Sequence, residues 1–379
     1  MSAVGKHSQP YPWEQRKLGD LGSVQMNKRI FKDQTSESGE VPFFKIGTFG
    51  KKPDSFISKK LFDEYKSKYP YPEVGDILIS ASGSIGRTVV YEGEDAYFQD
   101  SNIVWLEHDG RLKNSFLEQF LKRTKWNKIE GSTIKRLYNK DILNKKINLP
   151  KLKEQEKVGQ LFQYLDKTIT LHEEKHRQLE RLKKALLQKM FADETGYPAL
   201  RFKGFTAKWE QRKLGDITRR YDNLRVPVTA SKRKHGDIPY YGANGIQDFV
   251  SGYTHDGEFI LVAEDGARDP KNYPVNYVNG KIWVNNHAHV LQGIQGLANN
   301  LFLLNGIKKI NIVAYLVGGS RAKLNAETLM QLSIKLPSIH EQEKIGQLFQ
   351  SLDKTITLHD KKIQYLKQLK RGLLQKMFI

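Results

Sequence analysis

Residues Leu149–Phe191 have the sequence LPKLKEQEKVGQLFQYLDKTITLHEEKHRQLERLKKALLQKMF, and Leu336–Phe378 repeat it as LPSIHEQEKIGQLFQSLDKTITLHDKKIQYLKQLKRGLLQKMF. The two copies are identical at 29 of 43 positions. Internal repeats decide the architecture of a chain, so this one is organised as two halves. Because there are only two copies, we expect a pseudo-two-fold molecule and not a solenoid.

Each copy of the repeated segment is predicted to be one long helix. Apolar residues follow alternating steps of four and three, as in Ile345, Phe349, Leu352 and Ile356. That spacing is typical of a heptad stripe, and about 40 residues of helix span roughly 60 Å. Ser338-x-x-Glu341 is spaced like a capping box at its start. An aspartate can also cap a helix, so a break at Asp166 and at the matching Asp353 is compatible with the pattern.

An amphipathic helix cannot bury its apolar stripe alone. Two nearly identical helices in one chain favour an antiparallel pair, with pairing to another subunit as the alternative. The residues expected in the seam are Phe162, Leu165, Ile169, His172, Phe349, Leu352, Ile356 and His359. The two histidines occupy matching positions. We interpret them as a polar pair that sets the register, with a metal or pH-switch role as the alternative.

A shorter repeat opens each half. The octapeptide WEQRKLGD occurs at Trp13–Asp20 and again at Trp209–Asp216. Its tryptophan and leucine are expected to anchor the start of each block against the helices. Its glutamate and arginine, at Glu14 and Arg16 and their counterparts Glu210 and Arg212, are expected to be exposed to a partner.

The two blocks between these repeats have mixed strand and helix patterns. GDILISASGSIGRTVVYEG predicts a hairpin, and LKNSFLEQFLKRTKWNKIE predicts an amphipathic helix with a basic face. In the second block, IPYYGANGIQDFV predicts a hairpin turning at Asn244–Gly245, and a helix is expected around NNLFLLNGIKKINIVAYLVG. The blocks therefore share a plan, while their surface residues differ. The expected fold class is mixed α/β.

Charge narrows the class of partner. The chain has 62 lysines and arginines against 42 aspartates and glutamates, a formal net charge of +20. The excess is spread along the whole chain and favours nucleic acid over a merely soluble basic protein. There is no cysteine, hence no disulfide and no thiolate metal site. No apolar run is long enough for a membrane span, and the N-terminus lacks a signal-peptide pattern, so a cytoplasmic location is expected.

Catalytic motifs are missing from the sequence. It contains no GxxxxGK[ST] phosphate loop, no HExxH, no GxSxG elbow and no Asn-Pro-Pro-aromatic motif. The Gly83-x-x-Gly86 pair is better explained by a hairpin turn. His287 and His289 lack further ligands and are interpreted as ordinary structural groups. We therefore expect no catalysis, cofactor or metal in this chain.

Together these motifs resemble one family. The octapeptide, the LP-x-x-x-EQEK-x-GQLFQ-x-LDKTITLH segment and the basic helix ending in LLQKMF resemble the specificity subunit of type I restriction–modification systems. RFKGFTAKWEQRKLGD from Arg201 resembles the family's lead-in to its second half, and IPYYGANG from Ile238 resembles the start of a target-recognition domain. The first lead-in departs from this pattern, since MSAVGKHSQPYP replaces the RFKGF type.

The resemblance implies two target-recognition domains separated by two long antiparallel coiled-coil helices. The corresponding boundaries are 1–148, 149–192, 193–335 and 336–379, for a domain and a helical spacer in turn. Each domain would bind one half of a bipartite site in double-stranded DNA. The chain itself would catalyse nothing. It would recruit two modification subunits, which methylate adenine, and ATP-dependent restriction subunits. S-adenosylmethionine, ATP and Mg are expected on those partners.

Candidate DNA-binding residues are those with suitable donors and acceptors on expected loops. They are Lys45, Ser82, Ser84, Arg87, Lys135 and Arg136 in the first block, and Tyr241, Asn244, Arg268, Lys271, Arg321 and Lys323 in the second. The dense run of Lys232, Arg233 and Lys234 suits phosphate contact or an exposed loop equally. Two rival functions stay open at this point: a coiled-coil interaction scaffold, and a self-contained restriction or modification enzyme.

Overall fold

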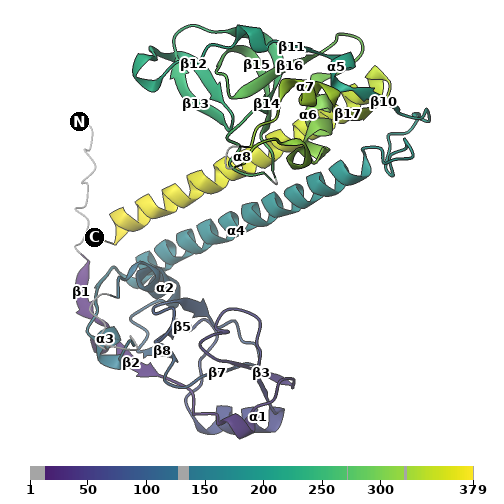
Figure 1. Cartoon of the computed structure of the whole chain (residues 1–379). Coiled ribbons are helices and arrows are strands. Elements are labelled where there is room, and N and C mark those ends of the chain that lie inside the picture. Colours follow the sequence, from purple (N-terminus) through teal and green to yellow (C-terminus); the bar gives the residue numbers. More distant parts are fainter. Residues whose placement is uncertain (1–12, 127–135, 271, 320–321, 379) are drawn as a thin grey trace, which may run out of the picture. The chain divides into compact units, whose positions relative to one another are not determined.

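The computed structural model describes residues 13–126, 136–270, 272–319 and 322–378. The chain divides into two compact units (Figure 1). The first unit comprises the residues up to Leu171 together with those from Ile363, and the second comprises His172–Lys362. Both units take part of α4 (Leu152–Lys189) and part of α8 (Ile339–Met377).

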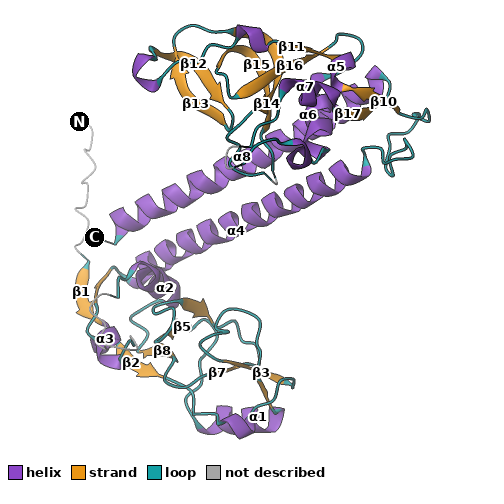
Figure 2. Cartoon of the chain, in the orientation of Figure 1, coloured by secondary structure: helices purple, strands orange, loops and turns teal. Residues whose placement is uncertain are grey.

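The first unit combines short strands with short helices (Figure 2). Strands β2, β8, β5 and β6 form one sheet, β4, β3 and β7 form another, and β1 pairs with β9. The strands are β1 (Glu14–Lys17), β2 (Gly22–Gln25), β3 (Val41–Phe44), β4 (Phe56–Ile57), β5 (Ile77–Ser80), β6 (Thr88–Val90), β7 (Tyr97–Phe98), β8 (Ile103–His108) and β9 (Lys146–Leu149), and the helices are α1 (Lys59–Lys68), α2 (Asn114–Arg123) and α3 (Asn139–Leu143).

The second unit has a single larger sheet with the order β11-β16-β14-β15-β12-β13, and a separate β10–β17 pair. The strands are β10 (Glu210–Lys213), β11 (Thr218–Arg220), β12 (His235–Gly242), β13 (Gly245–Val250), β14 (His255–Ala263), β15 (Val275–Val284), β16 (Ala288–Gly293) and β17 (Ser333–Leu336), and the helices are α5 (Leu214–Ile217), α6 (Asn300–Lys309) and α7 (Ala326–Gln331).

The octapeptide forms the same ribbon in both units. In the first, β1 pairs antiparallel with β9, so that Glu14 lies opposite Leu149. In the second, β10 pairs with β17 in the same register, and Glu210 lies opposite Leu336. The chain therefore enters and leaves each block on two neighbouring strands, and the two sequence repeats contact each other directly.

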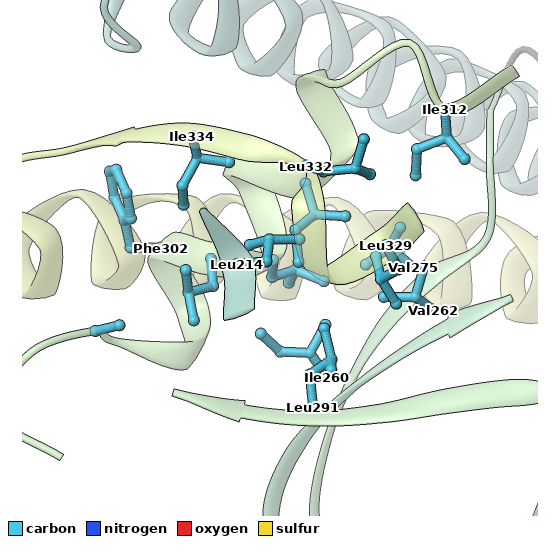
Figure 3. Packing of buried hydrophobic residues seen from close by; sticks show 14 of the residues in the cluster. Leu214, Ile260, Val262, Val275, Leu291, Phe302, Ile312, Leu329, Leu332 and Ile334 are labelled. Atoms are coloured by element: carbon cyan, nitrogen blue, oxygen red, sulfur yellow. The ribbon is translucent and has the colours of Figure 1, made fainter. Parts of the chain in front are cut away.

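Three of the four anchor residues of the octapeptides, Leu18, Trp209 and Leu214, are buried as expected, whereas Trp13 is only partly buried. Leu18 and Leu214 are both 0% exposed and lie in the main hydrophobic core of their units. Figure 3 shows Leu214 among apolar residues from several elements, including Phe302 of α6 and Ile334 of β17. In the first unit the matching core contains Phe116 of α2. This burial explains why these apolar residues occur in both copies.

Within each unit the two long helices run antiparallel. In the first unit, Phe162 of α4 packs against Phe378 with ring centroids 6.2 Å apart. In the second, Phe349 of α8 packs against Phe191 at 6.1 Å, and an ion pair joins Lys183 to Asp353. Residue numbers rise along one helix while those of its partners fall, which defines the antiparallel direction and confirms that the apolar stripes bury each other.

Four expectations need correction. No break occurs at Asp166 or Asp353, because both helices run through these positions and both carboxylates bind lysines instead of capping backbone amides. The blocks do not share one sheet plan, since the first has two small sheets and the second has one of six strands. Helix α6 ends at Lys309, well before the end of the expected apolar stretch. The capping box is half formed: Ser338 Oγ accepts from the Glu341 amide at 3.4 Å, but the Glu341 carboxylate binds Arg201.

Candidate functional site

Three loops of the first unit and Arg136 form one cluster, which we name the first loop cluster. It comprises residues 45–51, 81–87 and 99–102 with Arg136. The Ala81 amide donates to the Asn102 carbonyl at 2.8 Å, and Ser82 Oγ donates to Asn102 Oδ1 at 2.7 Å. Arg136 Nη2 donates to the Ser101 carbonyl at 2.5 Å. These bonds hold hydroxyl, amide and guanidinium groups side by side on loops.

The loop from Ala81 to Arg87 turns sharply because glycine is required within it. Gly86 has a φ of 80°, a region that other residues rarely adopt. A Cβ there would also lie 2.2 Å from the Trp126 ring, so Trp126 covers this turn closely. Arg87 next to it is exposed, and its Nη2 donates to the Gly50 carbonyl at 3.1 Å. One bond orients this guanidinium and leaves several of its donors available to a ligand.

The remaining candidates of the first unit have more local partners. Ser84 is exposed, and its carbonyl accepts a hydrogen bond from Ser80 Oγ. Lys45 lies 2.9 Å from Asp54 in an exposed ion pair. Exposed pairs of this kind stabilise a fold little, and a polyanion can compete for the lysine.

The loops of the second unit form a comparable arrangement, which we name the second loop cluster. It comprises residues 241–245, 264–270, 285–287, 317–319 and 322–323. Asn244 Nδ2 donates to the Gly266 carbonyl at 2.8 Å, and Asn244 Oδ1 accepts from the Arg268 amide at 2.9 Å. The turn of the β12–β13 hairpin is thereby fixed to the loop that follows β14. Asn244 is thus more than a turn residue.

A buried ionic network lies under this second cluster. The Glu264 side chain is 11% exposed and binds Arg225 Nη1 and Lys323 Nζ, each at 2.6 Å. Burial by itself raises the pKa of Glu264, but the hydrogen bonds from Lys323 and Arg225 outweigh it and hold that pKa below its usual value. Lys323 is itself half exposed, so Glu264 orients a cation that can reach a ligand.

Asp222 and His289 complete the network. His289 Nδ1 lies 2.7 Å from Asp222 Oδ2, and its Nε2 lies 2.9 Å from the Leu324 carbonyl. Burial raises the pKa of Asp222, but the hydrogen bonds from His289 and from the Val290 amide reverse the effect, and that pKa falls below its usual value. His289 is thus a satisfied core group, as the sequence suggested.

Within the described ranges, Asp222, Glu264 and His289 form a group whose ligand atoms are close enough to share a metal ion. Their charges are already matched, because Arg225 contacts both carboxylates and Lys323 contacts Glu264. A divalent cation would have to displace these two side chains. The arrangement is therefore better explained as ion pairing that supports the second loop cluster.

The other candidates of the second unit have different surroundings. Tyr241 belongs to β12 and is partly buried against a hydrophobic cluster of the second unit, and this burial raises its pKa. Arg233 stacks on the Tyr240 ring at 4.1 Å and binds Asp248, so its part of the basic run is held within the fold. Three candidates, Lys135, Lys271 and Arg321, lie outside the described residues.

A buried glutamine of the repeated segment ties each block to a long helix. Gln155 Nε2 donates to the carbonyls of Pro150 and Arg111, and its Oε1 accepts from the Lys113 amide at 2.9 Å. Gln342 makes the same three contacts, with Pro337, Leu297 and Asn299 as partners. Both glutamines are almost completely buried. Sequence periodicity missed them because they are polar.

A glycine brings each block close to the helix. A Cβ on Gly159 would lie 2.1 Å from Ser115 Oγ, and a Cβ on Gly346 would lie 2.8 Å from Leu301 Cβ. Glycine disfavours a helix interior, so its occurrence at matching positions of α4 and α8 needs a reason. The reason is that α2 lies very close to α4 at Gly159, and α6 lies very close to α8 at Gly346.

Ion pairs add to the attachment of the first block, and in the second unit an ion pair joins the two long helices. In the first unit, Lys122 of α2 and Lys370 of α8 both bind Asp166 of α4. In the second, Asp353 pairs with Lys183, and Lys308 of α6 lies in their field. Burial lowers the pKa of Lys308, and the neighbouring Lys183 lowers it further.

The seam histidines meet directly. Both belong to the second unit, where His172 Nδ1 and His359 Nδ1 are 3.0 Å apart. Desolvation lowers the pKa of His359, and the nearby His172 adds to the effect. A neutral pair can share one hydrogen bond at this distance, whereas two charged rings would repel each other. Of the other seam candidates, Phe162, Leu165, Ile169, Phe349 and Ile356 are buried and Leu352 is partly buried.

The repeated frame and its two loop clusters can be compared with known proteins. The family model described as the type I restriction modification DNA specificity domain matches residues 10–181 and again residues 206–368. The chain belongs to this DNA specificity family. The two matches correspond to the two halves of the chain, and the general role of the family is to recognise a DNA sequence without catalysis.

Relatives of this family agree with the assignment. The chain is 58% identical over 155 residues to the putative type I restriction enzyme specificity subunit S.HindORF215P of Haemophilus influenzae, a match that covers 41% of this chain and only 40% of that relative. It is 23% identical to the putative type I restriction enzyme MjaX specificity subunit of Methanocaldococcus jannaschii, over 96% of this chain and 92% of the other.

A solved structure shows the same fold. The S subunit of a type I restriction–modification system from M. genitalium superposes with a TM-score of 0.72 at 17% identity, covering 100% of this chain and 98% of the other. The two-domain specificity-subunit fold expected from the sequence is thereby confirmed. None of the helices in the described residues is long and apolar enough to span a membrane.

Proposed function

We propose that this chain is the DNA-recognition subunit of a type I restriction–modification complex, and that each unit binds one half of a bipartite, asymmetric DNA site. The observation that carries this proposal is the contrast between frame and loops. The ribbon, the buried glutamine and the glycine contact recur in both units, while the loop clusters differ in sequence and structure. A common frame with two different loop clusters suits two different half-sites.

The chemistry of the loops supports direct contact with DNA. Arginine, lysine, asparagine and serine are side chains that bind base edges and phosphates. The first loop cluster holds Arg87, Ser82 and Arg136, and the second holds Asn244, Arg268 and Lys323. The net charge of +20 adds a sequence-independent attraction that weakens as salt rises.

The long helices are proposed to hold the spacing between half-sites and to dock two methyltransferase subunits. Leu171 and Leu358 occupy matching positions of the repeat, and 68% and 66% of their surfaces are exposed. Leu182 and Leu369 match in the same way and are also exposed. Exposed leucines on a helix suit an apolar partner surface. Because the same residues occur twice, the chain offers the same contact to two copies of one partner.

The remaining partners follow from the same proposal. Restriction subunits would join the complex and carry ATP and Mg, and the methyltransferase subunits would carry S-adenosylmethionine. The chain itself would bind double-stranded DNA without catalysing a reaction.

The test is to reconstitute the chain with its methyltransferase subunits and to map the methylated adenines on genomic DNA. We expect one bipartite site with a fixed spacer. Arg87→Ala should alter methylation through one half-site only, and Lys323→Ala through the other. Lys68→Ala, which removes an exposed lysine paired with Glu64 on α1, is the matched control and should leave the site unchanged.

Two results would contradict the proposal. If the chain bound DNA weakly, with no dependence on sequence even when the methyltransferase was present, it would be an interaction scaffold. If the purified chain transferred methyl groups without partners, it would be a self-contained enzyme.

A further inference from the structure

Glu154 and Glu341 occupy equivalent positions of the repeated segment but differ in exposure and partners. The Glu341 side chain is 1% exposed, and Arg201 Nε and Nη2 donate to its two oxygens, each at 2.7 Å. The Glu154 side chain is exposed, and one oxygen accepts a hydrogen bond from Trp13 Nε1 at 3.3 Å. The carboxylate at this position of the repeat is therefore buried in the second unit, at Glu341, and accessible in the first unit, at Glu154.

Glu341 is covered by residues 201–205, which precede the second octapeptide and which we name the arginine–aromatic segment. Arg201 forms the bidentate pair, and Phe202 packs against the hydrophobic core. The centre of the Phe205 ring lies 6.1 Å from that of His340, and Lys344 Nζ lies 5.2 Å from the centre of the Phe205 ring. Phe202 packs against the same hydrophobic cluster that contains Trp209, which is 3% exposed.

The first unit has a cleft at the corresponding place. Its volume is about 500 Å³. Trp13, Leu149 and Leu152 form apolar parts of its wall, and Glu154 lines it as well. Trp13 is partly exposed, unlike Trp209. At the offset that aligns the two octapeptides, Gly5 and Lys6 occupy the positions of Arg201 and Phe202, so the matching positions provide neither an arginine nor a phenylalanine.

We propose that this cleft binds an arginine–aromatic segment of another protein chain, as the second unit binds its own Arg201 and Phe202. The carboxylate of Glu154 fits a guanidinium, which can form two parallel hydrogen bonds with it. The partly exposed Trp13 and the exposed Leu152 fit the following aromatic ring.

Charges around the cleft agree with this partner. The cleft is lined by the cations Arg16, Arg111 and Lys151 and by the carboxylates of Glu14 and Glu154. Arg16 is paired with Glu14, and Arg111 is paired with Asp109, so both arginines are already compensated. Glu154 adds a carboxylate and would repel DNA phosphate. The cleft therefore suits a protein partner and is independent of the proposed DNA contacts.

The experiment uses the full chain and a fluorescently labelled peptide, ALRFKGFTAK, which copies residues 199–208. Fluorescence anisotropy should show saturable binding of one peptide per chain. A peptide with glutamine in place of its arginine should bind at least tenfold more weakly, because a charge-assisted bidentate contact is lost. Glu154→Gln should weaken the original peptide to a similar extent. Glu156→Gln, an exposed neighbour on the same helix, is the matched control and should bind it normally.

Several results would overturn the proposal. They are the absence of saturable binding, equal binding of the arginine and glutamine peptides, and equal binding to the Glu154→Gln variant. Binding that appears only after Lys6→Ala would assign the cleft to the chain's own amino-terminal residues and would overturn it as well. The peptide substitution leaves the protein unchanged, so this comparison does not depend on how a variant folds.

Discussion

Replacing Gln155 with leucine should loosen the first unit while leaving the second intact. The side chain is 1% exposed and makes three hydrogen bonds: with the Pro150 and Arg111 carbonyls at 2.9 and 3.1 Å, and with the Lys113 amide at 2.9 Å. Leucine fills a similar volume but offers no partner to these backbone groups.

The cost follows from the three lost bonds. Each contributes about 1 kcal/mol net, which gives about 3 kcal/mol for the three, and the buried groups left without partners add to this loss, so Gln155→Leu should destabilise the first unit by at least that amount. That corresponds to a roughly hundredfold rise in the fraction of time that α2 is detached from α4.

Hydrogen–deuterium exchange read by mass spectrometry can locate this effect. Peptides covering α2 should exchange much faster in Gln155→Leu, and those covering α6 should not change. Gln342→Leu should show the reverse, since Gln342 makes the equivalent bonds in the second unit. Gln160→Leu removes an exposed glutamine of the same helix and should change neither unit by more than about 0.5 kcal/mol.

One pattern would refute this reasoning. If α2 kept its protection in Gln155→Leu, or if α6 lost as much as α2, the buried glutamine would not be what fastens each block to its helix.

Three further predictions concern packing and pH. Gly159→Ala should destabilise the first unit by about 1–3 kcal/mol through overpacking, whereas Gly372→Ala, where a Cβ meets nothing within 4 Å, should stabilise α8 by about 0.5–1 kcal/mol; urea denaturation compares them. The pKa of Glu264 is depressed by folding. Its contribution to the free energy of unfolding should therefore be present above its ordinary pKa of 4.5 and be lost as pH falls through the folded value. An acid titration of the second unit should show this loss, and Glu264→Gln should not. The pKa of His359 is also depressed, but protonation adds charge there, so helix-pair stability should rise as pH increases through the ordinary value of 6.5; a pH-independent melting temperature in this range would contradict the assignment.

Much of the frame was predictable because it depends on local patterns. Helix α8 and its partner α4 follow from apolar spacing, and the burial of Leu18 follows from its place in a repeated motif. The predicted β12–β13 hairpin forms, but its turn lies one residue earlier than expected, at Ala243 and Asn244, because Gly242 pairs with Gly245. These features need only the preferences of neighbouring residues and a stripe that must be buried.

The parts that depend on distant partners were not predictable. Asp166 is a good capping residue by type, yet two lysines far away in sequence engage it inside a continuous helix. Gln155 is polar and looks exposed in a helical pattern, but its partners lie in another element. Glu264 forms an ion pair with Lys323, and no rule based on sequence spacing predicts a contact between residues so far apart in the chain. Whether the candidate residues touch bases or phosphates also depends on a partner absent from the sequence.

The ribbon of entering and leaving strands has a consequence for how new specificities arise. Each block begins at β1 or β10 and ends on the neighbouring β9 or β17. A different block can be inserted between the same two strands without changing the core residues that the repeats supply. The two blocks of this chain already differ in this way, because one contains a six-stranded sheet and the other two small sheets, while each is attached to an equivalent pair of strands. Exchange of whole blocks, with crossovers inside the repeated segments, would therefore change the DNA sequence recognised in a single step and preserve the stability of the chain.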